Sequence, residues 1–482
     1  MNYRDILKQT CVDYMQMNEF LIDPLIFKKG KGIYLWDIND KKYIDALSGV
    51  FVCIFGHNYK PINQALTKQL NKLSFFPGLH GISDATLKFV EDLSSITPGN
   101  LNFVKAYTGG SEANEAAIKF AKQYHTQTNS PGKYKVLSLN LSYHGGTLAT
   151  TSISGLSKRR VKYEPLTYGH IKVPSPYQIY SKLKRRNSFN STFEGHYFIG
   201  ESFDLWKEAN QICADILEDT IINEHPDTIS SFIIEPICST AGIIEPSLNY
   251  FKTVRNLCDK YNIMLIFDEV LTGVAKTGKM FATEYTDVCP DIITIAKSIS
   301  NGTVPLSAFA VDTKYSDAFL GPWSQDSESV QFHTGITYAG MPLASAVGSA
   351  VINEVLTNDY IQKATNIGIQ LRAKLESLRK YDFVIDVRGR GSLLCVEINN
   401  DYFHKRYKNF TSFGDYLKKA TLKNGLIIRI DPHWFTLSPP LISTEAEIDK
   451  LFHLLEKSIE DVVKQWSKPG QHQIKGWRQH VL

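Results

Sequence analysis

The chain has 482 residues, of which 43% are hydrophobic and 21% are charged, and its formal net charge at neutral pH is +4. This composition is typical of an ordinary globular protein. Because the chain is too long for one small core, we expect a large domain and a smaller one. The small net charge argues against a general role in binding nucleic acid.

The seven cysteines are scattered and show no C-x-x-C spacing, which argues against a zinc site or a disulfide framework and fits a reducing compartment. The first residues lack the basic-then-apolar layout of a signal peptide. No apolar run approaches the roughly 18 residues that span a bilayer. We therefore expect a cytoplasmic protein with no metal and no membrane partner.

The first 60 residues mix a helical start with short strands at 32–37 and 42–45. From about residue 75 to residue 320, apolar β-branched runs alternate with helical segments, which predicts an α/β fold with a mostly parallel sheet covered by helices. The predicted strands of this sheet are 102–107, 135–140, 229–235, 263–268, 291–296 and 307–311.

The interval 163–225 is long, aromatic-rich and basic, and we interpret it as a loop insertion followed by a helix at 203–222. Helices at 343–357, 360–380 and 444–466 flank short strands, and the residues from 467 onward are interpreted as a tail. We expect the N-terminal segment to pack with the C-terminal part as a smaller α+β domain. The predicted division is 1–70, 71–335 with the insertion, and 336–482.

Four of the predicted strands end in polar or unusual residues. Glu235 follows one strand, Tyr143 and His144 follow another, and Asp268 and Lys297 end two more. In open parallel sheets, ligands bind beyond the carboxyl ends of the strands. This convergence carries more weight than any single residue.

An amine and a carboxylate at two strand ends are what a pyridoxal phosphate site requires. Lys297 would form a Schiff base with the cofactor, and Asp268 would keep the pyridine nitrogen protonated. An isolated lysine is more often a surface residue, and an Asp-Glu pair more often belongs to a loop. The apolar strands that precede Lys297 and Asp268 weaken both of those interpretations.

Gly109, Gly110 and Ser111 begin a helix whose free N-terminal amides could hold a phosphate. Taken alone, this start is as well explained by a plain helix cap. Tyr143, at a strand end, could stack on the cofactor ring, although a core aromatic is the alternative. His144 has a purely structural alternative as well.

Taken together, these segments resemble the class III aminotransferases of pyridoxal phosphate fold type I. The matching segments occur in family order over roughly residues 30 to 465. They are Gly110-Ser111-Glu112-Ala113-Asn114-Glu115, Tyr143-His144-Gly145-Gly146-Thr147, Glu235-Pro236, Phe267-Asp268-Glu269-Val270-Leu271-Thr272-Gly273, Ala296-Lys297, Gly335 to Pro342, Arg388-Gly389-Arg390-Gly391 and Ser438-Pro439-Pro440-Leu441.

The resemblance implies roles for the residues around the ring. Lys297 would carry the Schiff base and move the proton between substrate carbon and cofactor in a ping-pong reaction. Asp268 would pair with the pyridine nitrogen, and Val270 would pack on the ring face opposite Tyr143. Glu235 and His144 would belong to the same cofactor site.

The resemblance also implies how the phosphate is held and how the subunits assemble. Gly110 and Ser111 would bind the phosphate together with Thr337 of the neighbouring subunit. The active sites would then be shared across a homodimer, or within a dimer of such dimers, and a monomer would be inactive.

Two segments depart from the family pattern. Thr108-Gly109 stands where Asn-Ser is usual, which affects the phosphate loop. Gly273-Val274-Ala275-Lys276-Thr277-Gly278 replaces the usual G-F-G-R-T-G and so removes a common arginine.

The substrate is predicted from two weaker similarities. Arg429 lies in a segment resembling the one that supplies a carboxylate-binding arginine in pyruvate-linked ω-amino acid and amine transaminases. The stretch 433–438 lacks the Arg found in glutamate-linked relatives. These features favour pyruvate as the acceptor, although Arg429 could be only a surface strand residue. Phe51 would give the donor pocket an apolar wall, which favours an amine or a long ω-amino acid.

Three alternatives remain open at this stage. An aminomutase or amino-acid epimerase would use the same fold and cofactor, and a glutamate-linked or 2-oxoglutarate-linked aminotransferase would differ only in its acceptor. A non-catalytic relative acting through its basic insertion would need neither Lys297 nor Asp268.

Overall fold

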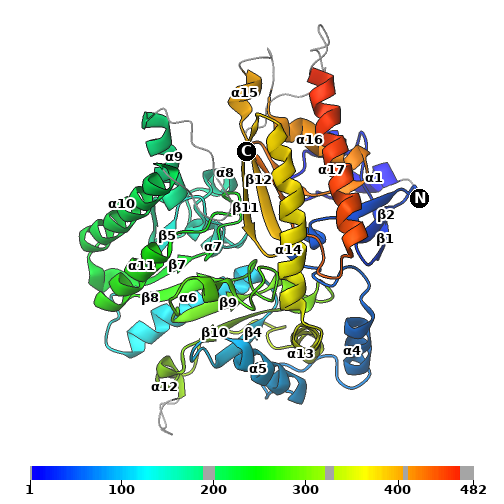
Figure 1. Ribbon diagram of the computed structural model, residues 1–482. Helices are drawn as coiled ribbons and strands as arrows, with labels where there is room; N and C mark the ends of the chain where they lie inside the picture. Colours follow the sequence, from blue (N-terminus) through cyan, green and yellow to red (C-terminus); the bar gives the residue numbers. More distant parts are fainter. Residues whose placement is uncertain (1–2, 188–200, 321–329, 405–410, 467–482) are drawn as a thin grey trace.

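Seven strands from the middle of the chain form the central sheet in a computed structural model that describes residues 3–187, 201–320, 330–404 and 411–466 (Figure 1). The strand order is β4-β10-β9-β8-β7-β5-β6. The strands span β4 Phe103–Tyr107, β5 Lys135–Leu139, β6 His170–Val173, β7 Ile229–Ile234, β8 Met264–Asp268, β9 Ile292–Ile295 and β10 Ser307–Val311.

The sheet is parallel except at one strand. β10 runs antiparallel to both of its neighbours, β9 and β4, whereas β6, β5, β7, β8 and β9 pair in parallel. All six predicted strands lie in this sheet. The prediction of an α/β fold with a mostly parallel sheet is therefore confirmed.

The interpretation of the interval after residue 163 as a loop is wrong for part of its length. This interval contains the edge strand β6 and helix α9 (Pro176–Asn187) before the expected helix, which is α10 (Glu201–Asn223). The sequence of β6 is only His-Ile-Lys-Val, and it pairs with a single neighbour, β5. A short edge strand needs no continuous apolar run, so its sequence signal is weak.

The two faces of the central sheet are covered by different helices because successive strand residues point to opposite sides. Phe232 and Phe267 belong to a core cluster with α10 and α11 (Leu248–Lys260). Ile233 and Ile266, next to them in sequence, belong to a cluster with the long helix α6 (Gly110–Gln127). The continuous apolar runs of these strands follow from burial on both faces.

Two smaller sheets lie outside the central sheet, and one of them joins the two ends of the chain. One has the order β1-β2-β3-β13 and the other β11-β12-β15-β14. Leu426 of β13 lies opposite Ile44 of β3, so the N-terminal and C-terminal parts share a sheet, as expected. The strands span β1 Phe27–Lys31, β2 Tyr34–Asp37, β3 Lys42–Asp45, β11 Val384–Arg390, β12 Leu393–Ile398, β13 Leu426–Ile427, β14 Arg429–Asp431 and β15 Trp434–Leu437.

Long helices pack the two parts together. α13 packs against both α4 and α5, and α14 packs against α17, which lies beside β1 and β2 (Figure 1). The remaining helices are α1 Tyr3–Leu7, α2 Met17–Phe20, α3 Ser48–Phe51, α4 Lys60–Leu70, α5 Asp84–Ile96, α7 Leu148–Ile153, α8 Ser157–Arg160, α12 Asp317–Leu320, α13 Pro342–Thr357, α14 Tyr360–Glu376, α15 Asn400–His404, α16 Phe413–Lys423 and α17 Glu445–Trp466.

The described residues contain neither a membrane-spanning helix nor a metal-binding cluster. None of the helices there is both long and apolar enough to cross a membrane. No group of three or more His, Cys, Asp or Glu side chains in the same part of the chain is arranged to hold a metal ion.

Candidate active site

Three of the predicted site residues meet at one edge of the central sheet. Asp268 is the last residue of β8, Glu235 follows β7 directly, and Lys297 comes two residues after β9. These three strands are neighbours and run in parallel, so their carboxyl ends share an edge. The sheet thus brings together residues that are far apart in sequence.

Asp268 is a buried carboxylate held by three hydrogen bonds. Its Oδ2 accepts from Asn114 Nδ2 and from His144 Nδ1, both at 2.8 Å, and its Oδ1 accepts from the Val270 amide at 3.0 Å. A carboxylate offers roughly four acceptor positions, so about one remains for a further N–H group. This arrangement fits the partner of a protonated ring nitrogen.

Asn114, on α6, is a functional candidate that the sequence analysis quoted but gave no role. Its Nδ2 also donates to the His144 carbonyl at 2.7 Å, and its Oδ1 accepts from Thr294 Oγ1 of β9 at 2.6 Å. Asn114 therefore fixes Asp268 and His144 against the neighbouring strand. Its sequence signal is faint, being a single amide among the alanines on the buried face of a helix.

His144 lies behind Asp268 and is fully buried. Because its Nδ1 faces the Asp268 carboxylate, Nδ1 carries the proton, and Nε2 is left as a buried acceptor with no partner among the described residues. This geometry supports a role for His144 in orienting Asp268.

Glu235 is the second buried acid at this edge. Its Oε1 accepts from the Tyr143 amide at 3.0 Å and from Cys238 Sγ at 3.4 Å. Burial raises the pKa of Glu235, and His144 opposes that rise. Glu235 thus ties the loop that carries Tyr143 to the end of β7.

Lys297 begins a 3-10 turn (Lys297–Ser300) with a φ of 50°, in the left-handed region that favours glycine. Its Nζ makes no hydrogen bond to any described residue, and the side chain is only partly exposed. Burial lowers the pKa of Lys297, and Arg429 lowers it further, against the opposing charges of Asp268 and Glu235. A lowered pKa makes the neutral, nucleophilic amine easier to reach.

The start of α6 and the turn after β8 touch each other. A Cβ atom at Gly110 would lie 2.7 Å from Val270 Cγ1, so only glycine fits under Val270. Ser111 Oγ accepts from the Gly146 amide at 3.0 Å and keeps its hydroxyl hydrogen for another partner. The carboxylate of Glu112 accepts from the amides of Thr108 and Gly109. The amides of the first helical turn that follow could bind an anion.

These groups fit pyridoxal phosphate. The carboxylate has room for one ring N–H, the amine has no competing acceptor, and the glycine-rich helix start can hold a phosphate. When bound, this cofactor supplies an electron sink for carbanion chemistry at an amino-bearing carbon. The fold and the site together define a pyridoxal phosphate-dependent enzyme.

Comparisons with known proteins are consistent with this class. The family model for aminotransferase class-III matches residues 15–459. A probable aminotransferase of Mycobacterium tuberculosis is 32% identical over 92% of this chain and 91% of its own length. An adenosylmethionine-8-amino-7-oxononanoate aminotransferase of Staphylococcus aureus is 31% identical over 96% of this chain and 99% of its own. The structure of the omega transaminase from Pseudomonas jessenii in complex with PMP superimposes with a TM-score of 0.85, at 25% identity, over 98% of this chain and all of that one.

The chain belongs to the class III aminotransferases. It is a transaminase, and its cofactor is pyridoxal 5'-phosphate.

The residues predicted to contact substrate lie in different environments. Arg429 on β14 donates from Nε to Asp431 Oδ2 at 3.2 Å, and its guanidinium lies 4.8 Å from the centre of the Trp434 ring. Phe51 is only 1% exposed and packs in a core cluster with Trp434, whereas its neighbour Val50 is 57% exposed. Val50 is therefore the exposed apolar side chain of this turn.

The turn that carries Phe51 is left-handed. Residues Ser48 to Phe51 all have φ between 50° and 68°, which costs roughly 1–2 kcal/mol for each non-glycine residue. Asp45 holds this turn, because its carboxylate accepts from the Leu47 amide at 3.1 Å and the Gly49 amide at 2.7 Å. Strained backbone of this kind is typical of functional sites.

Lys276 occupies the place of the missing family arginine and is completely buried. Its Nζ donates to the Leu271 carbonyl and to Ser298 Oγ, both at 2.7 Å. It thereby joins the turn after Asp268 to the turn that begins at Lys297. The sequence analysis noted the departure from the motif but did not predict this contact.

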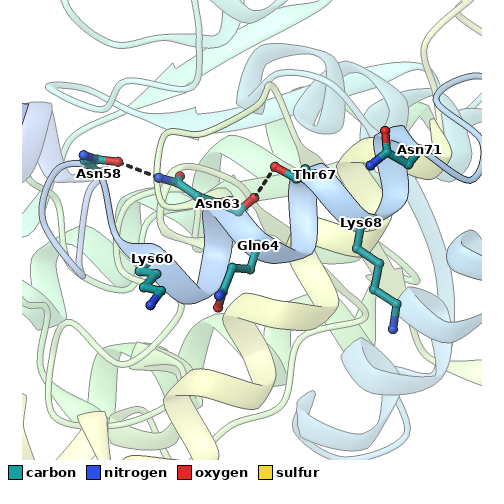
Figure 2. A pocket seen from close by; sticks show the side chains of 7 residues that line it. All are labelled: Asn58, Lys60, Asn63, Gln64, Thr67, Lys68 and Asn71. Carbon is teal, nitrogen blue, oxygen red and sulfur yellow. Dashed lines mark hydrogen bonds between the residues drawn. The ribbon is translucent and has the colours of Figure 1, made fainter.

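Thr337 and a hollow along α4 both lie on the surface. Thr337 is exposed in a turn, and its contribution to a neighbouring subunit stays a prediction. A polar hollow along α4 is lined by residues such as Asn63, Thr67 and Lys68 (Figure 2). This hollow contains none of the predicted site residues, so it is separate from the strand-end site.

Proposed function

We propose that this transaminase takes the amino group of an amine or ω-amino acid and delivers it to pyruvate. The observation that carries the proposal is the placement of Lys297, whose amine has no hydrogen-bond partner in the part of the chain that the structure describes, at the same sheet edge as the buried carboxylate Asp268. Lys297 Nζ would move the proton between the amino-bearing carbon of the donor and the cofactor. Asp268 would hold the proton on the ring nitrogen throughout.

The supporting residues have distinct proposed roles. Gly110 and Ser111 would bind the phosphate, and Val270 and Tyr143 would pack against the cofactor ring. His144 orients Asp268, as its 2.8 Å contact with that carboxylate supports. Glu235 anchors the Tyr143 loop through its bond to the Tyr143 amide.

Arg429 supports pyruvate as the acceptor. Burial is the main cause that lowers the pKa of Lys297, and the charge of Arg429 adds a smaller lowering, which supports a position of Arg429 on the same side of the sheet as that amine. The bond to Asp431 and the contact with Trp434 hold the guanidinium in place for a small carboxylate. The residues 433–438 supply no second arginine or lysine for a dicarboxylate acceptor.

Several coarser proposals accompany this one. We expect a cytoplasmic homodimer in which Thr337 of one subunit reaches the phosphate in the other. Exposed apolar side chains around the N-terminus of α5 and near Thr337, including Leu79, Ile82, Ile336 and Tyr338, would be covered in that dimer. The proposed domain division is 1–70, 71–335 and 336–482.

A donor screen on purified, cofactor-loaded protein tests the proposal. Amines and ω-amino acids are supplied with pyruvate or with 2-oxoglutarate, and the carbonyl product and new amino acid are both quantified. We expect stoichiometric carbonyl product and faster turnover with pyruvate. A clear preference for 2-oxoglutarate would contradict the role given to Arg429, and rearranged substrate without any carbonyl product would indicate a mutase or epimerase.

A further inference from the structure

One arginine of the basic run 158–162 lies at the edge of the active site. The guanidinium of Arg159, on the short helix α8, lies 4.5 Å from the centre of the Tyr143 ring and 4.5 Å from the centre of the Tyr14 ring. Its Nη1 donates to the Tyr14 hydroxyl at 3.0 Å. The sequence analysis gave neither Arg159 nor Tyr14 a functional role.

This contact joins Tyr14, near the N-terminus, and helix α8 to the loop that carries Tyr143. Tyr143 is bonded through its amide to Glu235 and directly precedes His144, which touches Asp268. Burial raises the pKa of Tyr143, Tyr14 raises it as well, and Arg159 opposes them. The Tyr143 phenol therefore stays protonated at neutral pH, and the positive charge of Arg159 is not neutralised by a phenolate.

Arg159 also differs from the arginines near it in its partners. Arg160 is paired with Glu164, and Arg429 is paired with Asp431. Among the described residues, no carboxylate lies within ion-pair distance of Arg159. Two aromatic rings and the Tyr14 hydroxyl hold the guanidinium in position, and the Tyr143 phenol interacts with it as well.

We propose that Arg159, assisted by the Tyr14 hydroxyl, binds the carboxylate at the far end of the amino donor. A planar guanidinium fixed between rings presents a fork that matches a carboxylate. Arg159 is partly exposed and Tyr14 is 68% exposed, so both side chains are reached by solvent. This inference rests on the proposed function and narrows its donor class to ω-amino acids with an anionic end.

The test compares donors that differ only in the carboxylate. Arg159→Ala and the matched control Lys158→Ala are assayed with ω-amino acids of four to six carbons and with unbranched primary amines of equal length. Losing one charge-assisted hydrogen-bonded contact should raise KM for the amino acids roughly tenfold to a hundredfold. KM for the amines and for pyruvate should change less than about twofold, and Lys158→Ala should behave as the wild type.

Two further variants should raise KM for the ω-amino acids by smaller amounts. Arg159→Lys keeps the charge but loses the planar fork, so it should fall between the wild type and Arg159→Ala. Tyr14→Phe removes the hydroxyl that orients the guanidinium and should raise KM for the amino acids by a few-fold only. An equal loss on amines and amino acids would show that Arg159 merely positions Tyr143 and would overturn the proposal.

A separate binding measurement distinguishes failure of this inference from failure of the proposed function. Pentanoate, which carries no amine, is titrated calorimetrically into the cofactor-loaded wild type, Arg159→Ala and Arg429→Ala. Weaker binding to Arg159→Ala supports the subsite even if no donor is turned over with either acceptor. Binding that is lost only in Arg429→Ala would assign the carboxylate to Arg429 and overturn the role of Arg159.

Discussion

Two lysines lie within one small region of this chain, and they differ in what their amines contact. Lys276 is completely buried, and its Nζ donates two hydrogen bonds that join neighbouring turns. Lys297 is partly exposed, and its Nζ has no hydrogen-bond acceptor among the described residues. Burial lowers the pKa of both amines, and the charge of Lys297 lowers that of Lys276 further.

The comparison shows that a perturbed pKa does not by itself identify a reactive lysine. A neutral amine has two N–H donors, and Lys276 uses two on fixed acceptors, so its amine is committed to structure. The amine of Lys297 is left for a ligand. Its backbone is left-handed, with a φ of 50°, which is a strained conformation for a residue with a side chain. Burial prepares both groups, but hydrogen bonding decides which one can react.

Removing the reactive amine should have the largest effect. Lys297→Ala is expected to lower turnover by at least roughly 10³-fold, because both the nucleophile and the proton carrier are lost. Its melting temperature should stay close to that of the wild type, since Nζ makes no hydrogen bond to the residues that the structure describes. Borohydride reduction followed by mass spectrometry should attach the cofactor to residue 297 in the wild type, and label at any other lysine would contradict the assignment.

Neutralising the acid partner should have the next largest effect. Asp268→Asn keeps the shape of the side chain but removes the charge that holds the ring proton, so turnover should fall roughly 10²-fold or more. The dissociation constant for pyridoxal phosphate, measured by fluorescence titration, should rise. Turnover within tenfold of the wild type would show that Lys297 works without this carboxylate.

The structural lysine should respond in the opposite way. Lys276→Met keeps the chain length but leaves the Leu271 carbonyl and the Ser298 hydroxyl without their donor, at a cost of about 1–3 kcal/mol in unfolding free energy. Urea denaturation measures this loss. Lys276→Arg, which restores the residue common in the family, should recover part of the stability, and loss of turnover without loss of stability would place Lys276 among the reacting groups.

A third cation, His57, gives a smaller and pH-dependent effect. Burial lowers the pKa of His57, but its 2.8 Å contact with Asp45 outweighs burial and raises the pKa to about 9. Because the folded pKa lies above the unfolded one, the stabilisation is complete below about pH 6.5 and is lost as the pH rises through 9. His57→Gln should therefore cost about 1–2 kcal/mol at pH 6 and little at pH 10. Equal unfolding curves for the variant and the wild type at pH 6 would contradict the pairing.

The sequence predicted most of the central sheet because its signal is local. Apolar runs predicted six of the seven strands to within one or two residues, and the strand predicted at 307–311 coincides with β10. β6 and α9 were missed because a short edge strand and an amphipathic helix in a basic interval resemble a surface loop. The left-handed turn at Ser48 was also missed, because its backbone is set by the carboxylate of Asp45 rather than by a sequence motif.

The sequence indicated which residues could react but not which residues hold them in place. Lys297 and Asp268 were proposed because each ends an apolar run, where a parallel sheet presents its ligands. Asn114 was not identified, since nothing in the sequence indicates that an amide on α6 will meet a carboxylate 154 residues away. Arg159 has no sequence signal of this kind either, because only folding places it against Tyr14 and Tyr143.

The sequence alone determined the order of strands and helices and which residues end them, because side-chain periodicity and turn chemistry act between neighbours in the chain. Tertiary structure decided that Lys276 is hydrogen-bonded whereas Lys297 has no hydrogen-bond partner among the described residues. It also decided that Asp268 accepts three hydrogen bonds. Those outcomes depend on hydrogen bonds between segments that meet only in three dimensions, and bonding of that kind has no period in the sequence.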